Sequence, residues 1–319
     1  MAPDDLQAFT LFHPYAAERL DDAERERRRF VHYTSADVAM SIIKNRSVWM
    51  RNAMTMNDFS EIQHGFKCLA YAWGQDEGGK QIKGLLDEVQ PGLAQVLENQ
   101  FDGWLPNFQA RTYVTCISEH RDEENEHGRL SMWRAYGGTS GVALVINSGP
   151  FMSNNDKSAA YSSPVAYLSP ESFAAQMRQI AETMAASRPL LARLGATALQ
   201  GHVFSMLTTA MVCTKHPGFG EELEWRVVYN PDLSRSAAIV EAVETVRGVP
   251  QIVQKLPLVN DPDNGLEGAA LPDLLEKVII GPTDHQTSLR HAFVALLQEA
   301  GVPNAHERIT ISGIPLRHS

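Results

Sequence analysis

Short β-type runs alternate irregularly with helical stretches of unequal length along this chain, and that irregularity limits the folds open to it. A regular β-α-β rhythm would indicate a parallel sheet flanked by helices, whereas scattered strands indicate separate sheet and helical regions. The sequence therefore predicts an α+β fold. The predicted strands are residues 30–33, 47–51, 111–118, 141–147, 223–229, 251–259, 276–280 and 308–312.

The predicted domain organisation is one large domain with two helical additions. A chain of 319 residues with 44% hydrophobic residues can bury a core of that size. Residues 1–29 are predicted to form an N-terminal helical extension and residues 30–319 a single α+β domain. Residues 170–214 are predicted to be a helical insertion. Residues 119–128, which hold five carboxylates and two histidines, are expected to be an exposed loop.

Composition excludes several classes of protein. The formal net charge of -10 creates a field that repels polyanions, so unselective binding to nucleic acid or anionic membranes is not expected. The three cysteines are widely separated, which indicates neither a disulfide framework nor a thiolate metal site. The N-terminus does not resemble a secretory signal, and no apolar run approaches the roughly 20 residues that cross a bilayer. We therefore expect a cytoplasmic protein with no membrane partner and no resident metal.

Three short cassettes of residues suited to nucleotide chemistry occur in order along the chain. They are His-Tyr-Thr at 32–34, Ser-Met-Trp-Arg-Ala-Tyr at 131–136 and Glu-Leu-Glu-Trp-Arg at 222–226. In the first, His32 at the end of a strand can donate to a ribose hydroxyl or a carboxamide, with neighbouring hydroxyls to orient it. The alternative is a core histidine that is satisfied by the backbone.

The middle and last cassettes supply rings and carboxylates. Trp133 and Tyr136 are three apart, a helical spacing that lets both rings line one wall of a pocket; core packing is the alternative. Glu222 and Glu224 are two apart in a predicted strand, so both side chains should share a face. A fixed carboxylate there would stabilise the positive charge that builds on ribose when the nicotinamide bond breaks. An acidic strand edge is the alternative.

Further polar residues could support such a site. Asn57 can cap a predicted helix on which Asp58 and Glu61 share a face, and this group could orient Arg51 or a ribose, or bind a metal. Arg51, Arg134 and Arg226 are candidates for pyrophosphate contacts through bidentate hydrogen bonds. The alternative is that any of them pairs with a carboxylate of the motifs.

In combination, these motifs resemble a large bacterial family of uncharacterised domains, with the likeness running from about residue 30 to 317. The residues that carry it are His32-Tyr33-Thr34, Asn57-Asp58 with Glu61, Cys116 with Ser118, Met132-Trp133 with Tyr136-Gly137, Glu222 with Glu224-Trp225-Arg226, Ile279-Ile280-Gly281-Pro282 and Ser312-Gly313-Ile314-Pro315-Leu316-Arg317.

The cassette order is also similar to that of the ADP-ribosyltransferase superfamily, whose members place their site residues on a split sheet. This resemblance implies a split antiparallel or mixed sheet with helical insertions, and NAD as the substrate. By position, His32 would grip the nucleotide, Tyr136 would be the aromatic middle element, and Glu224 would be the catalytic carboxylate. Glu222 would help to activate the acceptor, and Ser118 or Ser140 would serve as the serine of the middle strand.

The function implied is cleavage of NAD and transfer of ADP-ribose to an acceptor that the sequence does not identify, in a toxin or an anti-phage effector. The residues expected to contact NAD are His32, Tyr33, Thr34, Arg51, Asn57, Ser118, Trp133, Tyr136 and Arg226, with Glu224 and Glu222 catalytic. One alternative is a nucleotide or nucleic-acid sensing module without turnover. Another is a metal-dependent nuclease built on Asp58, Glu61, Glu222 and Glu224, which the acidic net charge disfavours.

Overall fold

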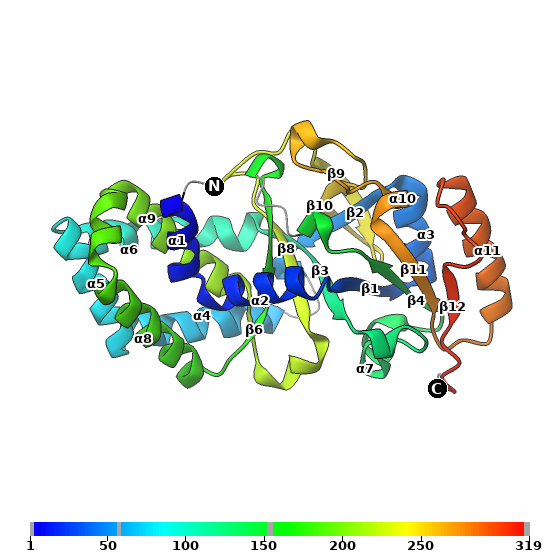
Figure 1. The fold of residues 1–319 in the computed structure, drawn as a ribbon, viewed down its shortest axis with the longest axis horizontal. Helices are drawn as coiled ribbons and strands as arrows, with labels where there is room; N and C mark the ends of the chain where they lie inside the picture. The colour runs from blue at the N-terminus through cyan, green and yellow to red at the C-terminus, as the bar shows by residue number, and fades with distance from the viewer. Residues whose placement is uncertain (1–2, 56–58, 152–155, 316–319) are drawn as a thin grey trace. The chain divides into compact units, whose positions relative to one another are not determined.

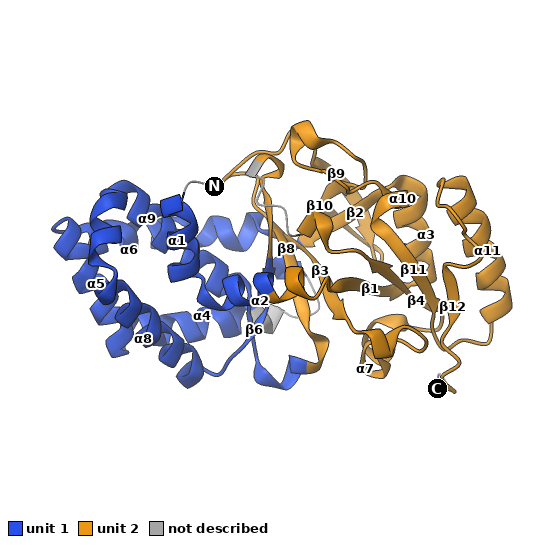
Figure 2. Ribbon diagram, in the orientation of Figure 1, with its two compact units in different colours: residues 1–21, 52–112, 163–220 blue, residues 22–51, 113–162, 221–319 orange. Residues whose placement is uncertain are grey.

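The computed structural model describes residues 3–55, 59–151 and 156–315. The chain folds into two compact units, each assembled from three stretches of sequence (Figure 2). We call residues 1–21, 52–112 and 163–220 the helical unit, and residues 22–51, 113–162 and 221–319 the sheet unit. The helices of 170–214 are therefore joined in one unit by those of 59–111, where the sequence analysis expected an N-terminal extension and a single insertion.

The helical unit buries the apolar faces of its helices against one another. In α5, for example, Ile82, Leu85 and Leu86 recur three and four apart and are buried. Its elements are α1 (Pro3–Phe12), the start of α2 (Pro14–Arg25), α4 (Phe59–Gly74), α5 (Glu77–Val89), α6 (Leu93–Arg111), α8 (Pro170–Ala186), α9 (Arg188–Val212), and the parallel strands β6 (Ala166–Tyr167) and β7 (Thr214–Lys215). Among the described residues, no helix combines the length and the apolar character needed to span a membrane.

The sheet unit is built on a ten-stranded sheet in the order β12-β11-β4-β1-β3-β2-β10-β9, with β8 between β3 and β5 (Figure 1). Its strands are β1 (Arg29–Ser35), β2 (Ser47–Asn52), β3 (Tyr113–His120), β4 (Gly141–Ile146), β5 (Ala160–Pro164), β8 (Glu224–Tyr229), β9 (Val240–Val246), β10 (Val249–Pro257), β11 (Leu275–Ile280) and β12 (Ile309–Ile311). Its helices are α3 (Ala36–Asn45), α7 (Leu130–Met132), α10 (Leu271–Leu274) and α11 (Gln286–Glu299).

The sheet is mixed, because β11 and β12 are parallel whereas β1 is antiparallel to both β3 and β4. The expectation of an α+β chain with a mixed sheet is thus confirmed as a description of the fold class. Each predicted strand overlaps an observed one, and no end is displaced by more than two residues.

Strand β3 has three neighbours, so the sheet branches there. Ser118 is opposite Val31 of β1 on one edge and opposite Glu224 of β8 on the other. Because β8 pairs with β3 along Tyr113–Ser118, the third neighbour, β2, must share the edge used by β1. Strands β1 and β2 therefore pair with different parts of one edge of β3. As a result, the first cassette, in β1, and the last cassette, at the start of β8, lie on opposite edges of β3.

The hairpin of β9 and β10 was not fully predicted, since only β10 was recognised. Arg247 and Gly248 join the strands with positive φ values of 50° and 83°, as a tight primed turn requires. Val243 of β9 is 71% exposed. In the described part of the chain, β9 is the last strand of the sheet order.

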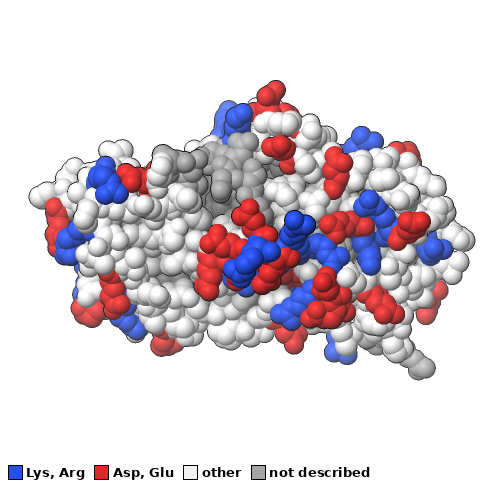
Figure 3. Space-filling view, viewed as in Figure 1, with Lys and Arg blue, Asp and Glu red and all other residues white. Residues whose placement is uncertain are grey.

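Acidic and basic side chains are interspersed on the face of the molecule seen in Figure 3. The net charge of -10 is therefore not displayed there as one uniform acidic surface.

Candidate functional site

The first cassette lies inside β1, and its residues face opposite sides of the sheet. Adjacent strand residues alternate, and residues opposite one another in a ladder share a face. Tyr33 therefore shares a face with Val31, Ser118 and Glu224, whereas His32 is directed to the other face.

His32 binds the backbone of the neighbouring strand: its Nδ1 lies 2.9 Å from the carbonyl oxygen of Cys116. The surrounding protein desolvates the ring and lowers the pKa of His32, although this backbone contact acts in the opposite direction. His32 therefore matches the alternative expectation, a histidine whose hydrogen bond is made to the backbone. Thr34, opposite Val142 on β4, shares the face of His32 and is partly exposed.

The ring of Trp133 is part of the core beneath Tyr33. Trp133 is 1% exposed, its indole nitrogen donates to the carbonyl of His127 at 2.8 Å, and it packs edge-on against Tyr33 with ring centroids 4.8 Å apart. Burial raises the pKa of Tyr33 to about 12. Trp133 therefore does not present a ring face on which a ligand could stack.

Tyr136 is the exposed ring of the middle cassette. It lies in a π-helical turn, Trp133–Gly137, and not in the regular helix that its spacing from Trp133 suggested. Its hydroxyl donates to Oε1 of Glu222 at 3.3 Å, and its side chain is 38% exposed. The middle and last cassettes are therefore in direct contact through Tyr136 and Glu222.

The expectation that Glu222 and Glu224 extend from one strand is wrong. Strand β8 begins at Glu224, Glu222 ends a short 3₁₀ segment, and Leu223 between them has a φ of +46°. A left-handed conformation is unfavourable for a residue with a β-carbon, and such strain is frequent at functional sites. The bend gives the two carboxylates separate environments.

Glu224 is held in a buried ion pair. Arg226 donates from Nε to Oε1 of Glu224 at 2.8 Å, and the two residues are 5% and 6% exposed respectively. Ser118, also buried, lies beside Glu224 on β3. Both charged groups of the last cassette that were expected to meet the nucleotide are thus engaged with each other.

The remaining predicted residues lie elsewhere. Arg51 is on β2 opposite Val253, where burial, followed by the charge of Arg247, lowers the pKa of its guanidinium. Asn57 and Asp58 lie outside the described residues. Within the residues that are described, no group of three or more His, Cys, Asp and Glu side chains is arranged to hold a metal ion.

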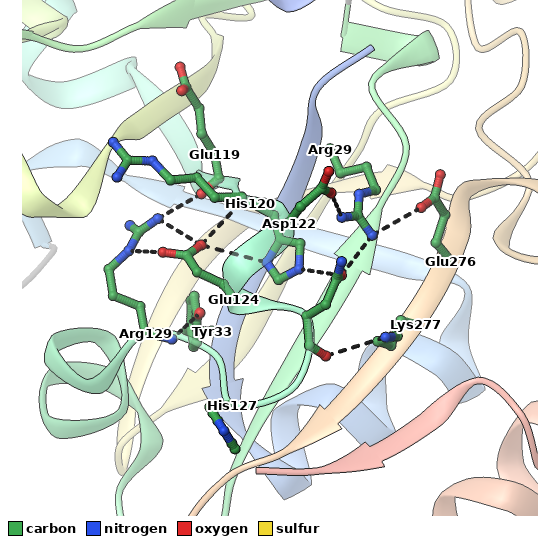
Figure 4. Close-up of polar contacts among 12 residues, drawn as sticks. Arg29, Tyr33, Glu119, His120, Asp122, Glu124, His127, Arg129, Glu276 and Lys277 are labelled. Carbon is green, nitrogen blue, oxygen red and sulfur yellow. Dashed lines mark hydrogen bonds and ion pairs between the residues drawn. The ribbon is translucent and has the colours of Figure 1, made fainter. Parts of the chain in front are cut away.

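The exposed loop predicted for residues 119–128 is confirmed only in part: residues 121–123, Glu126 and His127 are exposed, whereas Glu119 and His120 are buried and belong to a polar cluster with Glu124 and Arg129 (Figure 4). Arg129 donates to both carboxylate oxygens of Glu124, at 2.7 and 3.0 Å, and to the carbonyl of Glu119 at 2.8 Å. Its backbone nitrogen donates to the hydroxyl of Tyr33 at 2.8 Å. The cluster could not be predicted because Tyr33 and Glu222 are distant from Arg129 in the chain, and each charged residue alone resembles a solvated one.

His120 is the buried titratable group of this cluster. Its Nε2 lies 3.1 Å from Oδ1 of Asn125, and its Nδ1 lies 3.8 Å from Oε2 of Glu124 without a hydrogen-bond partner among the described residues. Desolvation lowers the pKa of His120; Asn125 opposes that shift, Arg29 adds to it, Glu124 opposes it, and Lys277 adds to it.

This arrangement predicts that His120 makes the protein less stable in mild acid. Because the pKa is lower in the folded state, the unfolded chain takes up the proton first as pH falls through about 6.5, and unfolding becomes easier. We expect His120→Gln to reduce the loss of thermal midpoint between pH 7 and pH 5. Equal losses in the variant and the wild type would contradict this role; His32 shifts in the same direction and leaves a residual slope.

Comparison with protein families gives one match. A family model described as a protein of unknown function (DUF2971) matches residues 132–227. This match is consistent with the expected resemblance to an uncharacterised family. Comparisons with curated proteins and with solved structures found no match.

The matched segment contains the last cassette and all of the middle cassette except Ser131. It begins at Met132 and ends at Val227, so it includes Tyr136, Glu222 and Glu224, whereas His32 lies outside it. The residues in mutual contact, Tyr136 and Glu222, therefore both lie within the DUF2971 match.

Proposed function

We propose that the protein is an ADP-ribosyltransferase-like enzyme that cleaves the bond between nicotinamide and ribose in NAD and passes ADP-ribose to an acceptor or to water. The observation that carries the proposal is the meeting of the three cassettes within the sheet unit. Tyr33 packs against Trp133, and Tyr136 of the same turn binds Glu222. The branching of the sheet at β3 also supports it, because the cassette order resembles that of enzymes with a split sheet.

Glu222 is the carboxylate proposed to face the ribose. It is less buried than Glu224, and its partner Tyr136 is exposed, so both are accessible to a substrate. As the glycosidic bond breaks, the electron pair leaves with nicotinamide and positive charge develops on the ribose ring, where a fixed carboxylate stabilises it. Glu224 with Arg226 then holds the start of β8 and does not react.

Nicotinamide release tests this proposal directly. We expect wild-type protein to release nicotinamide from NAD and Glu222→Gln to lower the rate by about 100-fold or more, since removal of one stabilising group at the transition state has effects of that order. Tyr136→Phe should lower it less, by about tenfold, because one hydrogen bond to Glu222 is lost.

The matched control is Glu221→Gln, which changes the exposed neighbouring carboxylate. It should retain the wild-type rate. Equal release by wild type and Glu222→Gln would reject the assignment of Glu222.

A second candidate is a nucleotide-binding module without turnover, which is favoured by the burial of Glu224 against Arg226 and by the direction of His32. Isothermal titration calorimetry with NAD separates the two functions. A binder gives saturable heat without nicotinamide release, whereas the enzyme gives both.

A further inference from the structure

We propose that Arg129 is a positioning residue that fixes the direction of Glu222; the catalytic part of this inference rests on the function proposed above. Nη1 of Arg129 donates to the carbonyl oxygens of Glu221 and Glu222, at 2.8 and 3.0 Å. One nitrogen thus holds two successive peptide units immediately before Leu223.

The other donors of the same guanidinium fix where this nitrogen lies. Nη2 binds the carbonyl of Glu119 at 2.8 Å, and both Nε and Nη2 bind the carboxylate of Glu124 (Figure 4). A planar guanidinium presents its donors in a rigid fork, so these contacts determine the position of Nη1. The side chain of Arg129 is only 12% exposed, which limits competition from water.

The two peptide units that Arg129 binds lie outside the hydrogen-bonded ladder of the sheet. Leu223 has a φ of +46° and interrupts the approach to β8, so the carbonyls of Glu221 and Glu222 lie before the ladder begins. Backbone carbonyls removed from water need donors, and Arg129 supplies them. On the far side of the bend, the carbonyl of Leu223 accepts from the backbone nitrogen of Glu119 at 2.9 Å.

The bend is therefore pinned on both sides, by Arg129 before Leu223 and by Glu119 after it. The direction in which the Glu222 side chain leaves the backbone follows from these contacts. The backbone nitrogen of Arg129 also binds Tyr33, which ties this bend to the first cassette. Arg129 does not touch the reacting atoms in this scheme; it acts through Glu222.

Two substitutions test the inference: Arg129→Lys changes the guanidinium directly, and Glu124→Gln perturbs it more weakly through its anchor. Lysine keeps the charge but lacks the fork, and glutamine keeps the shape of Glu124 while it weakens the anchor of Arg129. The matched control is Arg121→Lys, an exposed arginine from the same segment. Two quantities are measured: kcat and KM for nicotinamide release, and hydrogen exchange of the Glu119 amide, which reports on the bend through Leu223.

For Arg129→Lys we expect kcat to fall by about 10- to 100-fold with little change in KM, because a small displacement of a catalytic group has effects of that size. Exchange of the Glu119 amide should rise by at least about tenfold, while the amides of β4 keep their protection. Glu124→Gln should change both quantities in the same direction but less, and Arg121→Lys should change neither.

The two measurements distinguish failure of this inference from failure of the proposed function. If wild-type protein releases no nicotinamide, the proposed function is rejected, and the exchange measurement alone decides whether Arg129 holds the bend. Wild-type exchange of the Glu119 amide in both Arg129→Lys and Glu124→Gln would overturn the inference. Wild-type kcat in Arg129→Lys, from an active enzyme, would overturn the positioning role even if exchange rises.

Discussion

Replacing Trp133 by alanine is expected to lower the free energy of unfolding by about 3–5 kcal/mol, the range for large aromatic side chains removed from a core. Trp133 belongs to a buried cluster with Val31, Tyr33 and Ala143. The substitution removes the edge-on contact with Tyr33 and leaves the carbonyl of His127 without the indole donor. Denaturant unfolding followed by circular dichroism measures the loss.

A substitution at Gly281 provides a complementary test, because it adds volume beside Trp133 instead of removing it. A β-carbon built on Gly281 would lie 2.7 Å from the Trp133 ring. Gly281→Ala should therefore cost about 1–3 kcal/mol through overpacking, and combining it with Trp133→Phe should recover part of that loss. If Trp133→Ala were as stable as wild type, the ring would be free to serve a ligand and its placement in the core would be wrong.

Breaking the buried ion pair of the last cassette should have an effect of similar size. Arg226→Met removes the guanidinium that binds Glu224 and leaves a carboxylate in a buried place, which costs about 3–5 kcal/mol when no other cation compensates. The double variant Arg226→Met with Glu224→Leu should regain most of that stability, because well-packed apolar pairs replace buried ion pairs at little cost.

A double-mutant cycle on unfolding free energies measures this coupling. Additive losses for Arg226→Met and Glu224→Leu would show that the two groups do not stabilise one another. Two further variants separate the two carboxylates of the cassette: folded Glu224→Gln should retain nicotinamide release, whereas Glu222→Gln should lose it.

Much of the sheet could be predicted because its strands carry local signals. The alternating residues of 30–33 and 47–51 lie in β1 and β2, and the apolar run after Gly141 is β4. The hairpin partner β9 carried a weaker signal: valines and a threonine precede a glycine turn, but valine recurs every third residue in 240–246 and does not alternate with polar residues. The grouping of 59–111 with 170–214 carried no local signal, because contacts between distant helices depend on side-chain packing across the whole unit.

Only part of the candidate site was predictable from the sequence, and its arrangement was not. The cassettes do meet, yet the pleat of β1 directs Tyr33 to them and His32 away. A leucine with a positive φ is rare, so the bend at Leu223 could not be predicted from its residue type. The cluster around Arg129 was missed because its partners Tyr33 and Glu222 lie more than 90 residues away in the chain.

The hairpin at the end of the sheet order has a consequence for how the protein behaves at high concentration. An outermost strand with apolar side chains offers its backbone to any second strand that approaches, which is a route to aggregation. In β9, Glu241 and Glu244 interrupt the valines, so two copies that approach edge to edge bring like charges together. We therefore expect Glu241 and Glu244, which also bind Gln254 and Lys255 of β10, to oppose self-association through this strand.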